Sequence, residues 1–265
     1  MNSVLDPNPS GYPTLVLLHG LGASKDSWVF QIDPFVKANM RPVAMDIPGF
    51  GEAPPPPHCK WEIPKVAGDL ARQIKSITDE PVILIGLSLG GCLSLQIILD
   101  HPGIVGGAVL VNTFASLRNS HPSEVLYFLR RGFSIGLAGM EKQAALVAER
   151  VFPHPGQELY RQTVINEILA SDPVVYRRAM IELFRLNLAP RLPEIDCPVL
   201  IISGEEDSTV SKRTQEVLVG SIRSSTQVII SDSGHATPVD QPEAFNAEVI
   251  KFVSQVTKIG SNLVD

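Results

Sequence analysis

A serine between glycines is the residue whose setting most clearly suggests chemistry. Ser88 stands in Gly86-Leu87-Ser88-Leu89-Gly90-Gly91, where the apolar run 81–85 ends and an apolar helical stretch begins. A serine hydroxyl is a useful nucleophile when a sharp strand-to-helix turn holds it exposed beside a base. Such a turn crowds the strand against the helix, so it needs small residues two positions before and after the serine. Gly86 and Gly90 meet that need, and we predict that Ser88 is a nucleophile rather than an incidental serine in a glycine-rich turn.

The base should be a histidine that follows a later strand, because sites in open α/β sheets gather at the carboxyl ends of the strands. His235 fits, since it follows the apolar run 227–230 on the loop Ser231-Asp232-Ser233-Gly234-His235. The other five histidines lie beside prolines in loop or inserted sequence, at the end of a helix, or before the serine: His58, His121, His154, His101 and His19. We predict His235 as the base.

A carboxylate should hold the tautomer of that histidine and stabilise the imidazolium. The run 198–202 is followed by Gly204-Glu205-Glu206-Asp207, and Asp207 is the best candidate on this pattern. Glu205 and Glu206 compete with it, and Asp232 is a weaker rival close to His235. The predicted order along the chain is serine, acid, histidine.

Negative charge develops on the substrate carbonyl oxygen during attack, so two main-chain N–H groups should point at that oxygen. One is Leu89, directly after the nucleophile. The other should come from His19-Gly20-Leu21-Gly22 after the first apolar run, and we assign it to Leu21. Gly20 and Gly22 could instead be ordinary turn glycines.

The elements that must position these groups are short runs rich in Val, Ile and Leu. They are continuous rather than alternating, which is typical of strands covered on both faces, and helical stretches separate them. These runs predict an α/β fold with a doubly wound parallel sheet. The runs are 14–18, 43–45, 81–85, 108–111, 198–202 and 227–230.

The strand pattern stops between Phe114 and about Pro190, where helix formers with aromatic and Met interruptions take over. We predict a core of residues 1–114 and 191–265, with a helical cap of residues 115–190 inserted in it. Candidate pocket residues come from both parts, although most are as well explained by the core: Trp28, Phe114, Phe128, Phe133, Met180 and Phe184.

These motifs, in this order, resemble the α/β-hydrolase superfamily from about Thr14 to Val256. Besides the turn at Ser88, the acid loop at Asp207 and Gly234-His235, the loops at 19–22 and 46–51 are similar to those of the family. The resemblance implies the α/β-hydrolase fold: a mostly parallel sheet flanked by helices, with an inserted helical cap. It also implies no cofactor, and the chain has no phosphate loop, dinucleotide fingerprint or metal-ligand cluster.

Serine attack followed by water cleavage of an acyl-enzyme makes carboxylic ester hydrolysis the expected reaction. We expect small to medium apolar ester substrates. A lactonase or a hydrolase of carbon–carbon bonds in ring-cleavage products is the alternative, and either would want a cation for a substrate carboxylate. Five arginines of the predicted cap could supply it: Arg130, Arg131, Arg177, Arg178 and Arg185. From another class, a binding protein that kept the fold without turnover is a further alternative.

The composition of the chain narrows the classes of molecule that the protein could bind. Twenty-two Lys plus Arg against 28 Asp plus Glu give a net charge of −6, which does not attract nucleic acid or an anionic membrane. Three widely spaced cysteines, Cys59, Cys92 and Cys197, make neither a disulfide framework nor a zinc site. We find no secretory signal and no apolar run long enough to span a bilayer, and we expect a cytoplasmic enzyme. The sequence does not indicate an oligomeric state.

Overall fold

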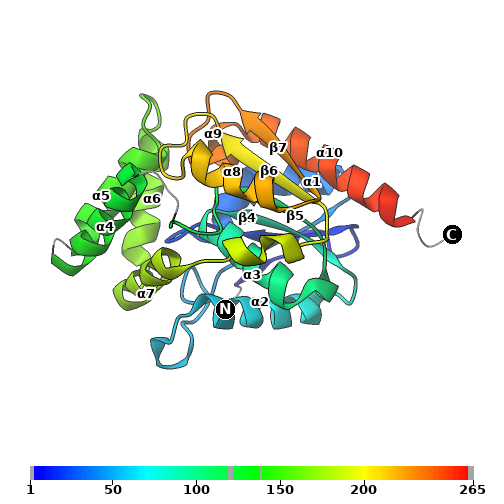
Figure 1. Ribbon diagram of the computed structural model, residues 1–265, viewed down its shortest axis with the longest axis horizontal. Coiled ribbons are helices and arrows are strands. Elements are labelled where there is room, and N and C mark those ends of the chain that lie inside the picture. The colour runs from blue at the N-terminus through cyan, green and yellow to red at the C-terminus, as the bar shows by residue number, and fades with distance from the viewer. Residues whose placement is uncertain (1–2, 119–121, 138, 262–265) are drawn as a thin grey trace.

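A seven-stranded sheet forms the centre of the protein in a computed structural model that describes residues 3–118, 122–137 and 139–261 (Figure 1). The strand order is β1-β3-β2-β4-β5-β6-β7, and every neighbouring pair is parallel except β1 and β3. The strands are β1 (Val4–Leu5), β2 (Thr14–Leu18), β3 (Arg41–Met45), β4 (Val82–Leu87), β5 (Val105–Val111), β6 (Val199–Gly204) and β7 (Ser225–Ile230).

The central strands of the sheet are buried on both faces, as the continuous apolar runs predict, whereas the edge strand β7 is mostly half-buried or exposed. Along β2, Val16 and Leu18 enter one hydrophobic cluster, and Leu15 and Leu17 enter a second cluster on the opposite face. Successive side chains of a strand point to opposite faces, so a strand covered on both sides must be apolar at every position. The predicted mostly parallel sheet flanked by helices is confirmed.

The edge strand β1 was not predicted. It has two residues and pairs antiparallel to β3, with Val4 opposite Met45 and Leu5 opposite Ala44. An ion pair between Asp6 and Arg41, with Oδ2 and Nη2 2.6 Å apart, joins the segment after β1 to the start of β3. Two residues are too few to establish a periodic pattern, so tertiary pairing rather than local sequence defines this strand.

Helices cover the two faces separately. The apolar sides of α2 (Ile63–Ile77), α3 (Leu89–Asp100) and α8 (Lys212–Ser221) join the first cluster. Those of α1 (Val29–Lys37) and α10 (Pro242–Ser261) join the second. Helix α3 is buried on almost every side, which agrees with its nearly uniform apolar sequence. The short helices are η1 (Lys25–Trp28), η2 (Pro57–Cys59), η3 (Pro102–Ile104), η4 (Ala189–Glu194) and α9 (Thr237–Asp240).

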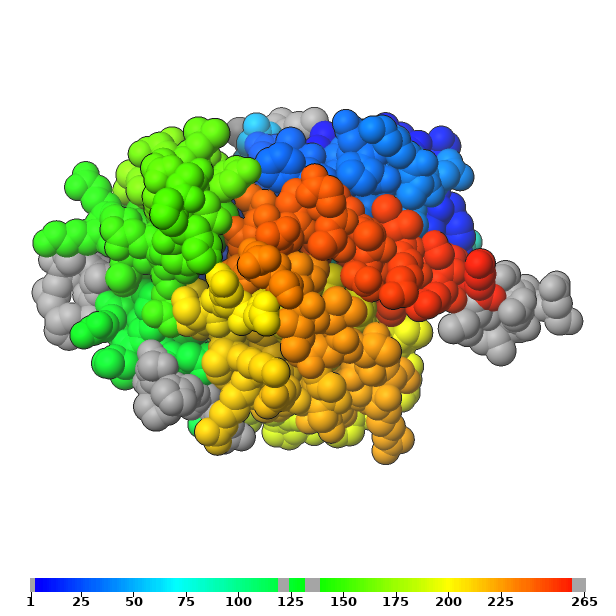
Figure 2. Space-filling model, turned by 90° about the horizontal axis from the view of Figure 1, so that it is seen from above, coloured from blue at the N-terminus to red at the C-terminus, as the bar shows by residue number. Residues whose placement is uncertain are grey.

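Four helices follow one another between β5 and β6 and stack beside one end of the molecule, drawn in green in Figure 1. Seen from above, they lie directly against the orange segment that contains the loop after β7 (Figure 2). They are α4 (Pro122–Leu137), α5 (Gly139–Val151), α6 (Glu158–Ala170) and α7 (Pro173–Arg185). Asp172 caps the start of α7 by accepting hydrogen bonds from the amides of Val174 and Val175. These helices fall inside residues 115–190, and the division of the chain into core and cap stays a prediction.

None of the helices in the described ranges is long and apolar enough to cross a membrane.

Candidate active site

Ser88 occupies a strained turn between β4 and α3. Its backbone has φ 53° and ψ −110°, a conformation that side-chain-bearing residues rarely adopt outside functional sites. The turn is fixed from the neighbouring strand: Ser88 N donates to Val111 O at 2.9 Å, and Thr113 Oγ1 donates to Ser88 O at 2.6 Å. The surrounding main chain holds the strain and orients the serine.

The glycines around Ser88 are required by close packing. A Cβ on Gly86 would collide with Gly90 O, and a Cβ on Gly90 would collide with Leu18 O on strand β2. The structure thus has the crowded strand-to-helix turn that the sequence pattern predicts.

His235 and Asp207 meet at the carboxyl ends of β6 and β7. His235 Nδ1 lies 3.0 Å from Asp207 Oδ2 and 3.2 Å from Oδ1. The Asp207 side chain is only 1% exposed, and its Oδ1 also accepts hydrogen bonds from the amides of Thr209 (2.8 Å) and Val210 (3.0 Å). These bonds fix the carboxylate, which in turn fixes the imidazole with Nδ1 as donor and Nε2 directed elsewhere.

The rival acids have other surroundings. Glu206 is exposed and pairs with His154, with Oε2 and Nε2 2.6 Å apart. Glu205 and Asp232 are exposed, and Asp232 has a left-handed backbone with φ 54°. Of the four carboxylates considered from the sequence, Asp207 is the one that contacts His235.

His19 has a structural environment. It is fully buried; its Nε2 accepts a hydrogen bond from Ile47 N at 3.0 Å, and its Nδ1 lies 2.8 Å from Gly20 O. Burial lowers the pKa of His19 to about 4, so the ring is neutral at pH 7. The neutral His19 ring therefore connects the loop after β2 to the loop after β3.

Ser88 and His235 line one cavity between the sheet edge and the helices α4–α6, with a volume of about 110 Å³. Its wall is mostly apolar, with contributions from Leu21, Val147, Val151, Phe152 and Ile168. Two further side chains with ionisable groups line it, Arg131 and Glu167. Burial raises the pKa of Glu167 to about 7, and its carboxylate accepts a hydrogen bond of 2.9 Å from Ser24 Oγ.

The two predicted oxyanion donors lie beside the serine. Leu89 is the first residue of α3, where a main-chain N–H has no acceptor within its own helix. Leu21 lines the cavity, and the preceding Gly20 lies over the nucleophile, since a Cβ on Gly20 would stand 3.9 Å from Ser88 Cβ. Gly22 has φ 78° and packs closely against Tyr176 and Ile168, so this position of the turn requires a residue without a side chain.

None of the five predicted pocket residues whose side chains are described lines this cavity. Trp28 is fully buried in the cluster on the far face of the sheet, where its ring lies 6.4 Å from that of Phe245. Phe114, Phe128 and Met180 are buried in the first cluster behind the cavity wall. Phe184 is 46% exposed on the outer side of α7. The side chain of Phe133 lies outside the described residues. The described large side chains of this prediction fill the cores or the surface, and the cavity is lined instead by aliphatic residues with Tyr127 and Phe152.

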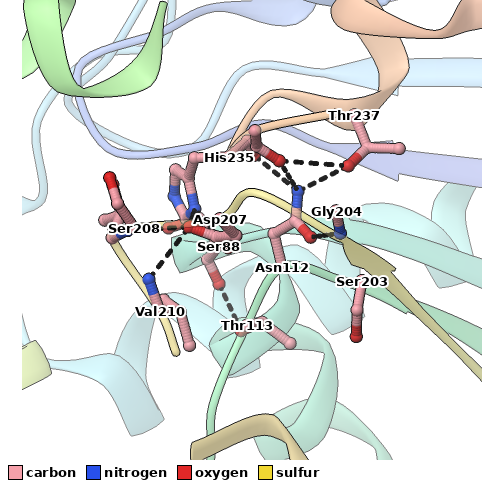
Figure 3. A network of polar contacts seen from close by, with 12 residues as sticks. Ser88, Asn112, Thr113, Ser203, Gly204, Asp207, Ser208, Val210, His235 and Thr237 are labelled. Carbon is pink, nitrogen blue, oxygen red and sulfur yellow. Dashed lines mark hydrogen bonds and ion pairs between the residues drawn. The ribbon is translucent and has the colours of Figure 1, made fainter. Parts of the chain in front are cut away.

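Asn112 is a site residue that the sequence analysis missed. It follows β5, is fully buried, and has a left-handed backbone with φ 45°. Its Nδ2 donates to His235 O (2.7 Å), Gly234 O (3.2 Å) and Thr237 Oγ1 (2.7 Å), and its Oδ1 accepts from Gly204 N at 2.8 Å (Figure 3). One side chain thus connects the loops that carry His235 and Asp207. The signal in the sequence was a polar residue directly after a buried strand.

No metal site accompanies this arrangement within residues 3–118, 122–137 and 139–261, where no three His, Cys, Asp or Glu side chains are grouped to bind an ion.

Comparison with known proteins identifies the class. Residues 15–248 match the model of the alpha/beta hydrolase family, and the chain belongs to that family. It is therefore a hydrolase, and the resemblance noted from the sequence motifs is confirmed.

Similar proteins cover the chain almost completely. A putative carbamate hydrolase, RutD, of Variovorax paradoxus is 27% identical over 262 residues, 95% of this chain and 96% of its own. A pimeloyl-[acyl-carrier protein] methyl ester esterase of Aeromonas hydrophila is 28% identical over 250 residues, 91% and 95% of the two chains. The crystal structure of an enol-lactonase from Burkholderia xenovorans superposes with a TM-score of 0.82 at 22% identity, covering 95% of each chain. At 22% identity, the similarity to the enol-lactonase shows a shared fold alone.

Proposed function

We propose that the protein is a serine hydrolase that cleaves carboxylic esters of small to medium, largely apolar acyl groups. The observation that carries the proposal is the hydrogen bond of His235 Nδ1 to Asp207, made by a histidine that shares one apolar cavity with Ser88. A buried carboxylate on one imidazole nitrogen leaves the other free to act as a base.

In the proposed reaction, His235 Nε2 accepts the proton of Ser88 Oγ as that oxygen attacks the ester carbonyl carbon. The main-chain N–H groups of Leu21 and Leu89 stabilise the negative charge on the carbonyl oxygen. The protonated imidazole, held by Asp207, gives its proton to the departing alcohol oxygen, which leaves an acyl group on Ser88. Water then attacks this acyl-enzyme, with His235 as base once more, and the acid product and free Ser88 are released.

The relatives support the same reaction class. The names of the two described above refer to a methyl ester and to a carbamate, and both are carbonyl compounds with an oxygen or nitrogen leaving group. The cavity volume of about 110 Å³ supports small acyl groups, and its largely apolar wall supports apolar ones. A lactonase or carbon–carbon bond hydrolase would use the same groups, and it has one observation in its favour, the presence of Arg131 in the cavity wall.

The test combines turnover with covalent labelling. We expect the purified protein to hydrolyse 4-nitrophenyl acetate and butyrate, and a fluorophosphonate to modify Ser88, located by mass spectrometry of the labelled peptide. Ser88→Ala should lose both. Ser76→Ala, which changes an exposed serine on α2, is the matched control and should retain both. A folded wild-type protein that neither turns over esters nor takes the label would be a non-catalytic binding protein and would refute the proposal.

A further inference from the structure

The cavity contains a buried cation. Arg131 on α4 is only 5% exposed, and it lines the same cavity as Ser88 and His235. Arginine is rarely buried to this extent, because removing its charge from water is costly. The Arg131 side chain therefore contacts the space that a bound molecule would fill.

The surroundings of Arg131 hold the guanidinium in place. Its Nη2 donates a hydrogen bond of 2.7 Å to Tyr176 OH on α7. The guanidinium carbon lies 5.5 Å from the centroid of the Tyr127 ring and 5.9 Å from that of Phe128. Hydroxyl and ring-face contacts orient a guanidinium. Arg131 is therefore prepositioned from two sides.

The other arginines considered from the sequence lie outside this cavity. Arg130, the neighbour of Arg131 in the chain, is exposed on the same helix. Arg177, Arg178 and Arg185 line a separate surface depression together with Glu62 and Glu182. Of these five arginines, Arg131 is therefore the one that lies where it could contact a substrate bound at Ser88.

We propose that Arg131 binds a carboxylate of the substrate, so that the enzyme acts on acyl compounds that carry a free carboxylate at a distance from the scissile carbonyl. The inference rests on the proposed hydrolysis at Ser88. A guanidinium donates two parallel hydrogen bonds to a carboxylate, and this pairing is strong in an apolar, water-poor cavity. The largely apolar wall of the cavity would contact the methylene groups of a short dicarboxylic acid half-ester.

A pair of near-isosteric substrates tests the turnover. We expect wild-type protein to hydrolyse mono-4-nitrophenyl adipate with a kcat/KM at least about tenfold above that for 4-nitrophenyl hexanoate, each corrected for the rate without enzyme. Arg131→Gln should lower the ratio of kcat/KM for the half-ester to kcat/KM for hexanoate roughly 10- to 100-fold. Arg131→Lys should fall between, because it keeps the charge but not the paired donors. Arg130→Gln, the exposed neighbour, is the matched control and should behave as wild type.

Binding of adipate itself, measured by isothermal titration calorimetry, provides a readout that needs no turnover. We expect one adipate per wild-type chain, with binding lost in Arg131→Gln and retained in Arg130→Gln. Absence of adipate binding to wild type overturns the inference, as does equal use of the two esters or an equal loss on both in a folded Arg131→Gln. Adipate binding that depends on Arg131 without hydrolysis of either ester supports the carboxylate site and refutes the proposed reaction.

Discussion

Asn112 and His235 are joined by a hydrogen bond of 2.7 Å from the Asn112 side-chain nitrogen Nδ2 to the main-chain oxygen of His235. Because Asn112 Oδ1 also accepts from Gly204 N, the same side chain fixes the strand end that precedes Asp207. Four bonds made by one buried amide hold the histidine loop at a set distance from the acid loop. The geometry of the proposed triad therefore depends on a residue that does not belong to it.

We predict that Asn112→Asp lowers kcat roughly 10- to 100-fold, because a carboxylate can still accept from Gly204 N but repels the two carbonyl oxygens that the amide now binds. Steady-state kinetics below the unfolding temperature measure the effect, with KM expected to change less than kcat. Asn246→Asp is the control, since Asn246 is also buried and donates to a carbonyl, that of Phe30, away from the cavity. Equal losses of kcat in the two variants would contradict a positioning role for Asn112.

The acid assignment predicts a ranking of two variants on one loop. Asp207→Asn should lower kcat by about 10²- to 10⁴-fold, because an amide does not stabilise the imidazolium and favours the wrong tautomer. Glu206→Gln should change kcat by less than about threefold, because the contact of Glu206 with His154 is exposed and distant from His235 in the hydrogen-bond network. Ester hydrolysis at pH 8 compares them, and the reverse ranking would move the acid from Asp207 to Glu206.

The turn at Ser88 should tolerate no additional carbon at Gly90. We expect Gly90→Ala to destabilise the protein by about 1–3 kcal/mol, because its methyl group would strike the main chain of Leu18. Gly220→Ala on α8 is the opposite case: no atom lies within 4 Å of its added methyl, and the higher helix propensity of alanine should stabilise by about 0.5–1 kcal/mol. Urea unfolding followed by circular dichroism measures both, and a stable Gly90→Ala would mean that β2 does not press on this turn.

Glu167 should make stability depend on pH. Burial raises its pKa from 4.5 to about 7, so the folded state binds more protons than the unfolded state between these two values. Stability is therefore lost as the pH rises from about 4.5 to 7, and the loss stays constant above that range. Relative to wild type, Glu167→Gln should gain stability between pH 4.5 and 8, by about 1–3 kcal/mol in all. Melting temperatures across this range test the trend, with exposed Glu149→Gln expected to stay parallel to wild type.

Much of the fold could be predicted from local sequence because a buried parallel strand is a short, continuous apolar run. The run 14–18 coincides with β2, and the other five runs lie within β3 to β7 or extend at most one residue before them. The strand β1 could not be predicted in this way, because two residues are too few to form such a run and their position depends on pairing with β3.

The candidate site likewise has residues that could be predicted from the sequence and residues that could not. Ser88, Asp207 and His235 could be selected because each follows a strand within a short, specific motif. The cavity wall could not, because an apolar residue on a helix has the same sequence character whether it faces a core or a cavity. Trp28 and Phe114 are examples: their size favoured a pocket role, but they fill the cores on the two sides of the sheet. Arg131 was one of five arginines with equivalent sequence surroundings, and the packing of α4 against Tyr176 distinguishes it.

The wall of the cavity has an unusual origin along the chain. Tyr127, Arg131, Val147, Val151 and Glu167, with three further wall residues, come from the uninterrupted stretch 127–168, whereas Ser88, Asp207 and His235 are collected from three separate strand ends. The part of the wall that the helices supply is consequently encoded apart from the proposed triad. An exchange of that single stretch for another would change a large share of the cavity lining while the three residues of the proposed triad are inherited unchanged.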